Sequence, residues 1–571
     1  AELFKTPTIR GVSEYLRRTA KHSYESIMPV EEKEYYVLSF AQQRMYILQQ
    51  MDLNSTAYNM PQAIPLSDGV DIEKLLETFK KLLKRHDSLR TSFHMIGDQP
   101  VQKIHRDIDF KIEKIEWSHF VRPFDLTRAP LLRVGLTEGN RYLLVDMHHI
   151  ISDGISHEVL RDDFKAFYEG KELPSLRIQY KDFVQWQNSP EELGRIHRQM
   201  LYWLNEFAGE IPVLELPLDY PRPLVQSFDG AGIEFEFSLE QTGSLNEIAL
   251  QAGATLFMVL TAVIDVLLAK ISGQEEIIIG TPTAGRRHSD LEKIIGMFVN
   301  TLAIKNYPIG ERTFGDFLAD VKERMLMVFD NREYPFEALV DKLVLNRDTG
   351  RNPLFDVMFS WQNMSDDYQS PKPGSQYEYH VAKFDLTFTA VEIDQKLFFS
   401  IQYCTQLFKP ETIDRFILYF RKVIDSVIEN KDQRISGIEI ISKEEKSQIL
   451  ENFNNTGTIY PQDKTIHRLF VEQVEKTPDH IALVGAGSQT CPIAISYNEL
   501  NAQSDRWAGL LIKKGVRGDD IVGIMMERSI EMIIGIFGIL KSGGAYMPID
   551  PEYPQERIDY MLKDSGAKWL V

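Results

Sequence analysis

The stretch that decides the fold is Tyr142-Leu143-Leu144-Val145-Asp146-Met147-His148-His149-Ile150-Ile151-Ser152-Asp153-Gly154. Its first six residues are mostly apolar and rich in strand-forming types, which predicts a β-strand. Two histidines end that run, a short polar segment follows, and a helix is predicted from Ser156 onward. The stretch therefore predicts a strand–turn–helix unit with two histidines and an aspartate at the turn.

The two histidines are adjacent in the chain, and adjacent residues of a strand point to opposite faces. One of His148 and His149 is therefore expected to face a cleft while the other supports the backbone. Two other interpretations stay open: both are hydrogen-bonded core histidines, or they bind a metal with Asp153 and His157. The spacing matches neither His-Glu-x-x-His nor His-x-x-Glu-His, so no metal site is predicted.

The composition describes a globular protein of 571 residues, long enough for several domains. Its 64 Lys and Arg against 83 Asp and Glu give a net charge of −19, which argues against nucleic acid and anionic membranes as partners. Cys404 and Cys491 are too few for a disulfide framework. No secretion signal is recognised. The apolar run 256–271 is short for a membrane span and contains Asp265 and Lys270, so it predicts a buried helix instead. A cytoplasmic location is expected.

Composition and pattern divide the chain into six segments. We expect a short helix at 1–20 and a linker at 21–34. Two lobes follow, at 35–210 and 211–435, with the proline-rich stretch 212–223 at their seam. The last two segments are a linker at 436–455 and a third unit at 456–571.

The third unit alternates apolar strands with amphipathic helices, which predicts a parallel sheet. The expected strands lie at 481–484 and 521–526, and the expected helices at 497–514 and 530–541. Residues 568–571 are predicted to be a strand that enters a sheet whose remainder is missing. The unit is therefore expected to be partial.

The pattern His148-His149-x-x-x-Asp153-Gly154 resembles the signature of condensation domains of nonribosomal peptide synthetases. Other acyltransferases, including chloramphenicol acetyltransferase, share its core. Further motifs of the condensation family follow in order, at 38–46, 85–93, 180–186, 295–301, 331–337 and 347–354. Within these motifs Tyr180, Phe183 and Trp186 are expected to be core packing, while Arg90 and Arg347 are expected to be structural.

The flanks resemble the neighbours of such a domain in an elongation module. Residues 3–9 and the helix after them resemble the end of a peptidyl carrier protein, while 495–500 and 540–550 resemble the first two motifs of an adenylation domain. The resemblance implies an α/β fold: two chloramphenicol-acetyltransferase-like lobes arranged as a V around a tunnel, plus a partial adenylation subdomain. Adenylation by this segment is not expected, because the family's phosphate loop and catalytic lysine would lie further on.

The resemblance also implies a reaction and its residues. A donor aminoacyl or peptidyl thioester would be attacked by the α-amine of an acceptor aminoacyl thioester. His149 would act as base or positioning group, His148 would support the strand end, and Asp153 would organise the loop through an ion pair with Arg286. The backbone N–H groups at Gly154 could stabilise the oxyanion.

Cofactor and partners follow from the same resemblance. The condensation domain itself binds no cofactor, and its substrates arrive on the 4'-phosphopantetheine of an upstream donor and a downstream acceptor carrier protein. An adenylation domain in the same chain is the other expected partner. Residues 39–42, 148–156 and 296–301 are more similar to the subtype that accepts an L-configured donor.

Two alternative functions are weighed against condensation. An epimerisation domain shares the histidine motif, but it usually closes a module, whereas this sequence continues into adenylation-like residues. A catalytically silent platform for docking carriers usually lacks the second histidine. Heterocyclisation domains replace both histidines with aspartates and are disfavoured.

Overall fold

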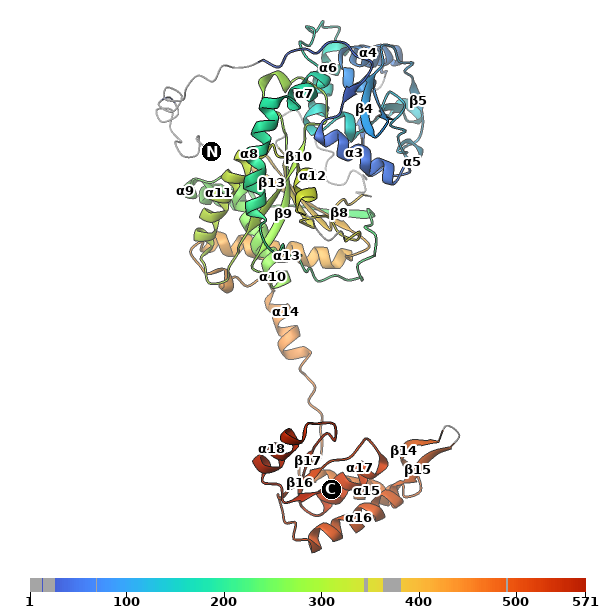
Figure 1. Ribbon diagram of the computed structural model, residues 1–571, viewed down its shortest axis with the longest axis vertical. Helices are drawn as coiled ribbons and strands as arrows, with labels where there is room; N and C mark the ends of the chain where they lie inside the picture. Colours follow the sequence, from blue (N-terminus) through green and yellow to red (C-terminus); the bar gives the residue numbers. More distant parts are fainter. Residues whose placement is uncertain (1–12, 14–25, 68, 344–347, 363–380, 489–490) are drawn as a thin grey trace. The chain divides into compact units, whose positions relative to one another are not determined.

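The computed structural model describes residue 13 and residues 26–67, 69–343, 348–362, 381–488 and 491–571. By internal contacts the chain divides between Lys443 and Glu444 into two units, which are described separately (Figure 1). The helix expected at 1–20, apart from Ser13, lies outside the described residues, as does Arg347.

The N-terminal lobe of the first unit is built on a four-stranded sheet that contains the predicted histidine strand, β7. The strand order is β2 (Asn59–Pro65), β7 (Tyr142–His148), β6 (Leu132–Leu136) and β5 (Ile112–Lys114). β7 pairs antiparallel with both neighbours. All of its residues after Tyr142 are buried, so both faces of the strand are covered. The predicted strand is confirmed.

Helices and a second small sheet complete this lobe. Helices α4 (Ile72–Arg85) and α6 (Gly154–Tyr168) pack against each other, and α3 (Phe40–Met51) packs against the turn that follows β7. The second sheet has the order β1 (Tyr36–Val37), β4 (Gln99–Ile104) and β3 (Thr91–Ile96). The short helix α5 (Trp117–Phe120) precedes β6. The helix after the histidine turn begins at Gly154, two residues before the predicted start.

The C-terminal lobe is built on a six-stranded mixed sheet. Its order is β10 (Asn300–Asn306), β9 (Ile277–Thr283), β11 (Val357–Gln362), β12 (Leu386–Ile393), β13 (Lys396–Cys404) and β8 (Gly230–Glu236). The lobe's longer helices are α9 (Leu239–Ala252), α10 (Leu256–Ser272), α11 (Phe314–Asp330) and α13 (Pro410–Glu429), and α12 (Phe336–Lys342) is short. α10 is buried along most of its length, which confirms the buried helix predicted from its apolar run.

The two lobes exchange segments where they meet. Helices α7 (Tyr180–Gln187) and α8 (Pro190–Glu206) lead from the first lobe to the second. α8 lies inside the predicted first lobe, yet its Trp203 packs in the core of the second and donates a hydrogen bond to the Asn331 carbonyl (2.9 Å). In return, Ile295 of the second lobe packs in the core of the first. A boundary at residue 210 therefore does not separate the two cores.

The second unit contains a three-stranded parallel sheet, as its pattern predicts. The strand order is β17 (Ala545–Pro548), β16 (Ile521–Ile524) and β18 (Trp569–Leu570), and both pairings are parallel. An additional antiparallel hairpin joins β14 (Ile481–Ser488) to β15 (Cys491–Ser496). The helices of this unit are α15 (Ile466–Lys476), α16 (Tyr497–Lys513), α17 (Ile530–Lys541) and α18 (Gln555–Ser565); α14 (Lys443–Ser447) precedes them.

The described helices were also compared with the length and apolarity that a membrane span requires. None of them alone is long and apolar enough; α9 and α10 reach the threshold only as a pair, and they are bent by 103° at the break between them.

A buried carboxyl in α10 gives a test of the core. Asp265 is fully buried, and its Oδ2 accepts a hydrogen bond from the Asn306 amide (2.7 Å). Among the described residues, Asp265 Oδ1 and Asn306 Oδ1 have no partner. Burial raises the pKa of Asp265 well above its usual value. A protonated carboxyl would donate to Asn306 Oδ1 and satisfy both atoms, so we expect the neutral form in the folded protein.

Asp265→Asn tests this assignment, because an amide stays neutral at every pH. A carboxyl whose folded pKa is raised contributes stability that is full below its unfolded pKa and is lost as pH rises through the folded pKa. The urea midpoint of the variant should therefore exceed that of the parent at pH 8, with the gap narrowing toward pH 4. Asp414→Asn, at an exposed position of α13, is the control. A variant that is less stable than the parent at pH 8 would contradict the assignment.

Candidate functional site

The chain turns between the two histidines. β7 ends at His148, and His149 begins the 3₁₀ turn η3 (His149–Ile151). The backbone N–H of His149 donates to the Tyr58 carbonyl (2.8 Å), just before β2. The expectation that both histidines lie on the strand is wrong, because the turn rather than strand alternation separates their side chains.

His148 supports the turn from inside the lobe. Its side chain is fully buried. Its Nδ1 accepts the Ile150 backbone N–H (3.1 Å), so Nε2 carries the proton and donates to Gln49 Oε1 (3.2 Å). Burial is the main cause that lowers the pKa of His148 to about 3, so the ring is neutral. These contacts hold the His148 ring between Gln49 of α3 and the turn.

His149 has the opposite tautomer and a partly exposed side chain. Its Nδ1 donates to the Ser152 carbonyl (2.7 Å), which leaves the lone pair of Nε2 available. Burial lowers the pKa of His149 to about 4, and the positive charge of Lys383 adds to the effect, while Asp153 opposes it. At neutral pH the residue is therefore a neutral imidazole that can accept a proton or a hydrogen bond at Nε2.

Asp153 and Arg286 form the predicted ion pair between the lobes. Arg286 Nη2 lies 2.8 Å from Asp153 Oδ1, and both side chains are buried, at 4% and 1% exposure. Asp153 Oδ1 also accepts the Ser156 N–H (2.7 Å) and caps α6, while Oδ2 accepts the Phe298 N–H (3.1 Å). The same carboxylate therefore holds the start of α6 and a strand-entry segment of the other lobe.

Arg286 is held in place by its own lobe as well. Its Nη1 donates to the Leu291 and Ile294 carbonyls (2.7 and 2.6 Å), and its guanidinium lies 4.0 Å from the centre of the Phe298 ring. Gly285 precedes it with φ +64°, and a Cβ there would lie 1.9 Å from the Phe298 carbonyl oxygen. Only glycine allows the backbone to make this approach.

The aromatic residues at 180–186 do more than fill the core. Tyr180 and Phe183 pack with Phe298, as predicted. In addition, the Tyr180 hydroxyl shares a hydrogen bond with Ser39 Oγ (2.8 Å) and donates to the Met297 carbonyl. Tyr180 therefore ties the start of α3 to the segment that crosses from the C-terminal lobe.

Gly154 is the first residue of α6 and is exposed. A Cβ built there would meet no atom within 4 Å, so neither packing nor backbone conformation demands a glycine. The N–H groups in the first turn of a helix have no partner inside the helix. Asp153 Oδ1 accepts the Ser156 N–H, and the space around the Cβ position of Gly154 is open.

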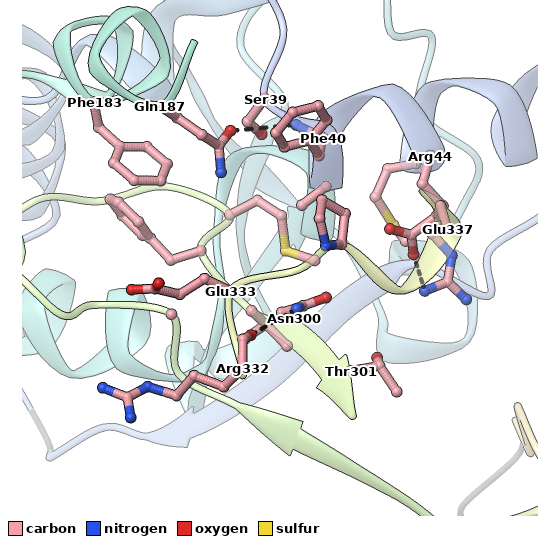
Figure 2. Close-up of a pocket in the computed structure, with 17 residues that line it drawn as sticks. Ser39, Phe40, Arg44, Phe183, Gln187, Asn300, Thr301, Arg332, Glu333 and Glu337 are labelled. Atoms are coloured by element: carbon pink, nitrogen blue, oxygen red, sulfur yellow. Dashed lines mark hydrogen bonds and ion pairs between the residues drawn. The ribbon is translucent and has the colours of Figure 1, made fainter. Parts of the chain in front are cut away.

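A pocket lies where the lobes meet, and Figure 2 draws its lining side chains. It encloses about 690 Å³, counting space open to solvent. At one end Arg44 Nη1 of α3 pairs with Glu337 Oε1 of α12 (2.7 Å), and on the floor the Asn300 amide donates to the Arg332 carbonyl (2.8 Å). Most of the lining comes from four sequence motifs, 38–46, 180–186, 295–301 and 331–337, which the fold brings together, and Gln187 and Gly285 complete it.

Two residues near His149 were not predicted. Ser156 Oγ lies 2.7 Å from Asp153 Oδ1 and 2.9 Å from the Gly296 carbonyl oxygen, and it accepts the Gly296 N–H (3.0 Å), which joins the ion pair to the other lobe. Lys383 lies just before β12 and influences both histidines electrostatically. A lone lysine outside any motif carries no signal in the sequence, whereas Ser156 could have been predicted as the helix-capping partner of Asp153.

Metal ligation has no support from geometry among the described residues, where no group of three or more His, Cys, Asp or Glu side chains could hold an ion.

Comparisons with known proteins point to one family. Residues 32–450 match the family model described as a condensation domain, and 470–571 match the one described as an AMP-binding enzyme. Gramicidin S synthase 2 of Brevibacillus brevis is 48% identical over the whole chain, and bacitracin synthase 3 of Bacillus licheniformis is 46% identical. The chain spans only 13% and 9% of the length of these two relatives.

A solved structure has the same fold. A four-domain nonribosomal peptide synthetase bound to AMP and glycine aligns with 96% of this chain and 44% of its own, with a TM-score of 0.78 and 24% sequence identity.

Removing Asp153 should destabilise the first unit more than removing His149. In Asp153→Ala, Arg286 remains buried without its partner, at an expected cost of about 3–5 kcal/mol. In His149→Ala a partly exposed ring is lost, and the main-chain bonds of the turn remain. Asp153→Asn keeps an oxygen for the α6 cap and should fall between the two. Thermal melts of the three variants check this order of stability. A lower melting temperature for His149→Ala than for Asp153→Ala would contradict the prediction.

Proposed function

The chain belongs to the condensation-domain family, whose model covers most of its length, and on that premise we propose that it forms amide bonds between carrier-bound substrates. The donor is an aminoacyl or peptidyl thioester, and the nucleophile is the α-amine of an acceptor aminoacyl thioester. The observation that carries the proposal is His149, a partly exposed neutral imidazole whose Nδ1 donates to the Ser152 carbonyl and whose Nε2 lone pair is therefore available.

In the proposed reaction the acceptor amine adds to the donor carbonyl and a C–N bond forms. The carbonyl electron pair moves to oxygen, and the nitrogen becomes cationic. His149 Nε2 accepts the excess proton from nitrogen; the C–S bond then breaks, and the departing thiolate takes up that proton. A free α-amine has a pKa near 7.7–8.0, so a neutral fraction exists at physiological pH and no strong base is required.

The other predicted site residues are assigned positioning roles. His148 holds the end of β7, and Asp153 with Arg286 fixes the loop that carries His149. The N–H groups at Gly154 are proposed to face the oxyanion, a role that preorganised backbone donors fill in other acyl-transfer sites. None of these residues exchanges a proton with substrate in this scheme.

The partners follow from the reaction. Donor and acceptor are proposed to arrive on the 4'-phosphopantetheine arms of an upstream and a downstream carrier protein, and the condensation region itself binds no cofactor. The pocket of Figure 2 is the proposed place for such an arm, because its lining combines the polar Gln187 and Asn300 with the apolar Met45 and Phe298. An adenylation domain in the same protein, a cytoplasmic location and an L-configured donor complete the proposal.

Domain limits are part of the same proposal: a carrier tail at 1–20, linkers at 21–34 and 436–455, and adenylation residues at 456–571. The condensation lobes at 35–210 and 211–435 are limits in sequence, because α8 of the first range packs in the core of the second lobe. The epimerisation alternative is not favoured, because the condensation match is followed by an AMP-binding match.

His149→Ala tests the proposed chemistry. Donor carriers charged with a panel of L-aminoacyl groups are mixed with charged acceptor carriers, and dipeptide is followed under single-turnover conditions. Loss of a general base typically costs 10²- to 10⁴-fold in rate, and we expect a loss in that range. His119→Ala, on the exposed side of α5, is the matched control and should equal the parent.

Equal product from His149→Ala and the parent would exclude the role of His149. No product from the parent with any pair of carriers would instead favour a docking platform. Loss of an α-deuterium label from a single charged carrier would indicate epimerisation.

A further inference from the structure

Lys383 is a cation of the C-terminal lobe for which the proposed reaction has no role so far. Its Nζ lies 4.7 Å from the centre of the Tyr58 ring in the N-terminal lobe. The carbonyl of the same tyrosine accepts the backbone N–H of His149 (2.8 Å). One residue therefore contacts both the ammonium of one lobe and the backbone of the candidate base of the other.

The ammonium of Lys383 has no anionic partner in the part of the chain that the structure describes. Among the described residues, its Nζ makes no ion pair and no hydrogen bond, although the side chain is partly buried. Other shielded lysines are paired: Lys181 with Asp87 (2.9 Å) and Lys541 with Asp505 (2.8 Å). Shielding a charge without a partner costs free energy, and such costs are typical of functional sites.

The charged groups around this point leave a net positive centre. On the N-terminal lobe, His148 and His157 are neutral because burial lowers the pKa of each, to about 3 and about 4. The charge of Asp153 is offset by Arg286. Arg44, whose charge also acts on Tyr58, is paired with Glu337. Of these described groups, Lys383 is the charge that no described neighbour neutralises.

We propose that Lys383 is a second catalytic residue, which donates a hydrogen bond to the oxyanion of the tetrahedral intermediate while His149 attends the amine. This inference rests on the proposed condensation function. As the C–N bond forms, the carbonyl electron pair moves to oxygen, and the negative charge develops beside the ammonium. Lys383 keeps its proton throughout and exchanges none with substrate, so the proton balance of the reaction is unchanged.

The same charge serves the base. An ammonium close to His149 disfavours the imidazolium before substrate binds and so keeps Nε2 free to accept a proton. Once the oxyanion has formed, its negative charge offsets the repulsion between the Lys383 ammonium and a protonated His149. The imidazole of His149 can then take up the proton from the amine. A cation and a base on opposite lobes therefore favour the charge-separated intermediate over the uncharged substrates.

The rate at alkaline pH distinguishes a catalytic role of the Lys383 charge from a role of its side chain in packing alone. Burial, with a smaller contribution from the charge of Arg44, lowers the pKa of Lys383 to about 8. The ammonium is lost as pH rises through that value, so the single-turnover rate of the parent should fall above about pH 8. In Lys383→Arg the charge persists at every accessible pH, because guanidinium titrates above pH 12. That variant should keep the rate near neutral pH and lose the alkaline decline.

Lys383→Met removes the charge and keeps the length of the side chain. We expect it to form dipeptide about 100-fold more slowly than the parent at pH 7.5, since a single oxyanion donor typically contributes 10²- to 10³-fold. Lys409→Met is the matched control: Lys409 also lies over a tyrosine ring of the C-terminal lobe (5.6 Å from Tyr220), but it is exposed. It should match the parent. Thermal melts of all variants confirm that they fold.

A second measurement follows His149 directly. With ¹³C-labelled histidine in the full chain, the Cε1–H signal that His149→Ala removes is titrated in the parent and in Lys383→Met. The titration midpoint should move to higher pH in Lys383→Met, because the repelling charge is gone.

Two results would overturn the inference: an unchanged rate in Lys383→Met, or an alkaline decline in Lys383→Arg identical to that of the parent. A parent that makes no dipeptide while the His149 midpoint still shifts would refute the condensation function and leave the Lys383–His149 proximity standing. An unshifted midpoint would refute that proximity whatever the activity.

Discussion

The buried ion pair between Asp153 and Arg286 is the contact on which the geometry of the first unit depends. Its two charges come from different lobes, and almost no solvent reaches either side chain. A pair so deep is favourable only when further hydrogen bonds satisfy it. Here the Ser156 and Phe298 N–H groups bind the carboxylate, and two backbone carbonyls bind the guanidinium. The start of α6, the crossing segment and the histidine turn are thereby fixed relative to one another.

Because the turn is fixed, backbone hydrogen bonds determine a different tautomer for each of the two histidines. A backbone N–H points at Nδ1 of His148 and makes that nitrogen an acceptor. A backbone carbonyl meets Nδ1 of His149 and makes that nitrogen a donor. The available lone pair therefore lies on Nε2 of His149, at the far side of the ring from the backbone. Neighbouring residues of one type thus have different chemistry because one precedes the bend in the chain and the other follows it.

The local sequence pattern was sufficient to predict individual strands and helices of this fold. The strand that leads into the histidine turn, the buried helix α10 and the parallel sheet of the second unit follow from apolar runs and periodicity. The pairing of Asp153 with Arg286 came from family resemblance, since nothing in the spacing of residues so far apart indicates contact. Pattern failed where lobes interleave: α8 follows the first lobe in sequence but packs in the core of the second, because Trp203 finds its apolar neighbours there. Lys383 was missed for the same reason, since its significance depends on Tyr58 of the other lobe.

The charged groups of the candidate site are divided between the two lobes, so neither lobe contains the whole site. The N-terminal lobe contributes the imidazole and the buried carboxylate, and the C-terminal lobe contributes two cations, Arg286 and Lys383. The carboxylate can neutralise only one of them, and its geometry selects Arg286, whose planar guanidinium bonds the carboxylate and two carbonyls at once. Lys383 is then left with an aromatic face as its neighbour. The contact that joins the lobes therefore uses the carboxylate of Asp153 and leaves Lys383 without an ion pair among the described residues. In the proposed reaction this charge lies near the proposed base, where developing negative charge gains most from it.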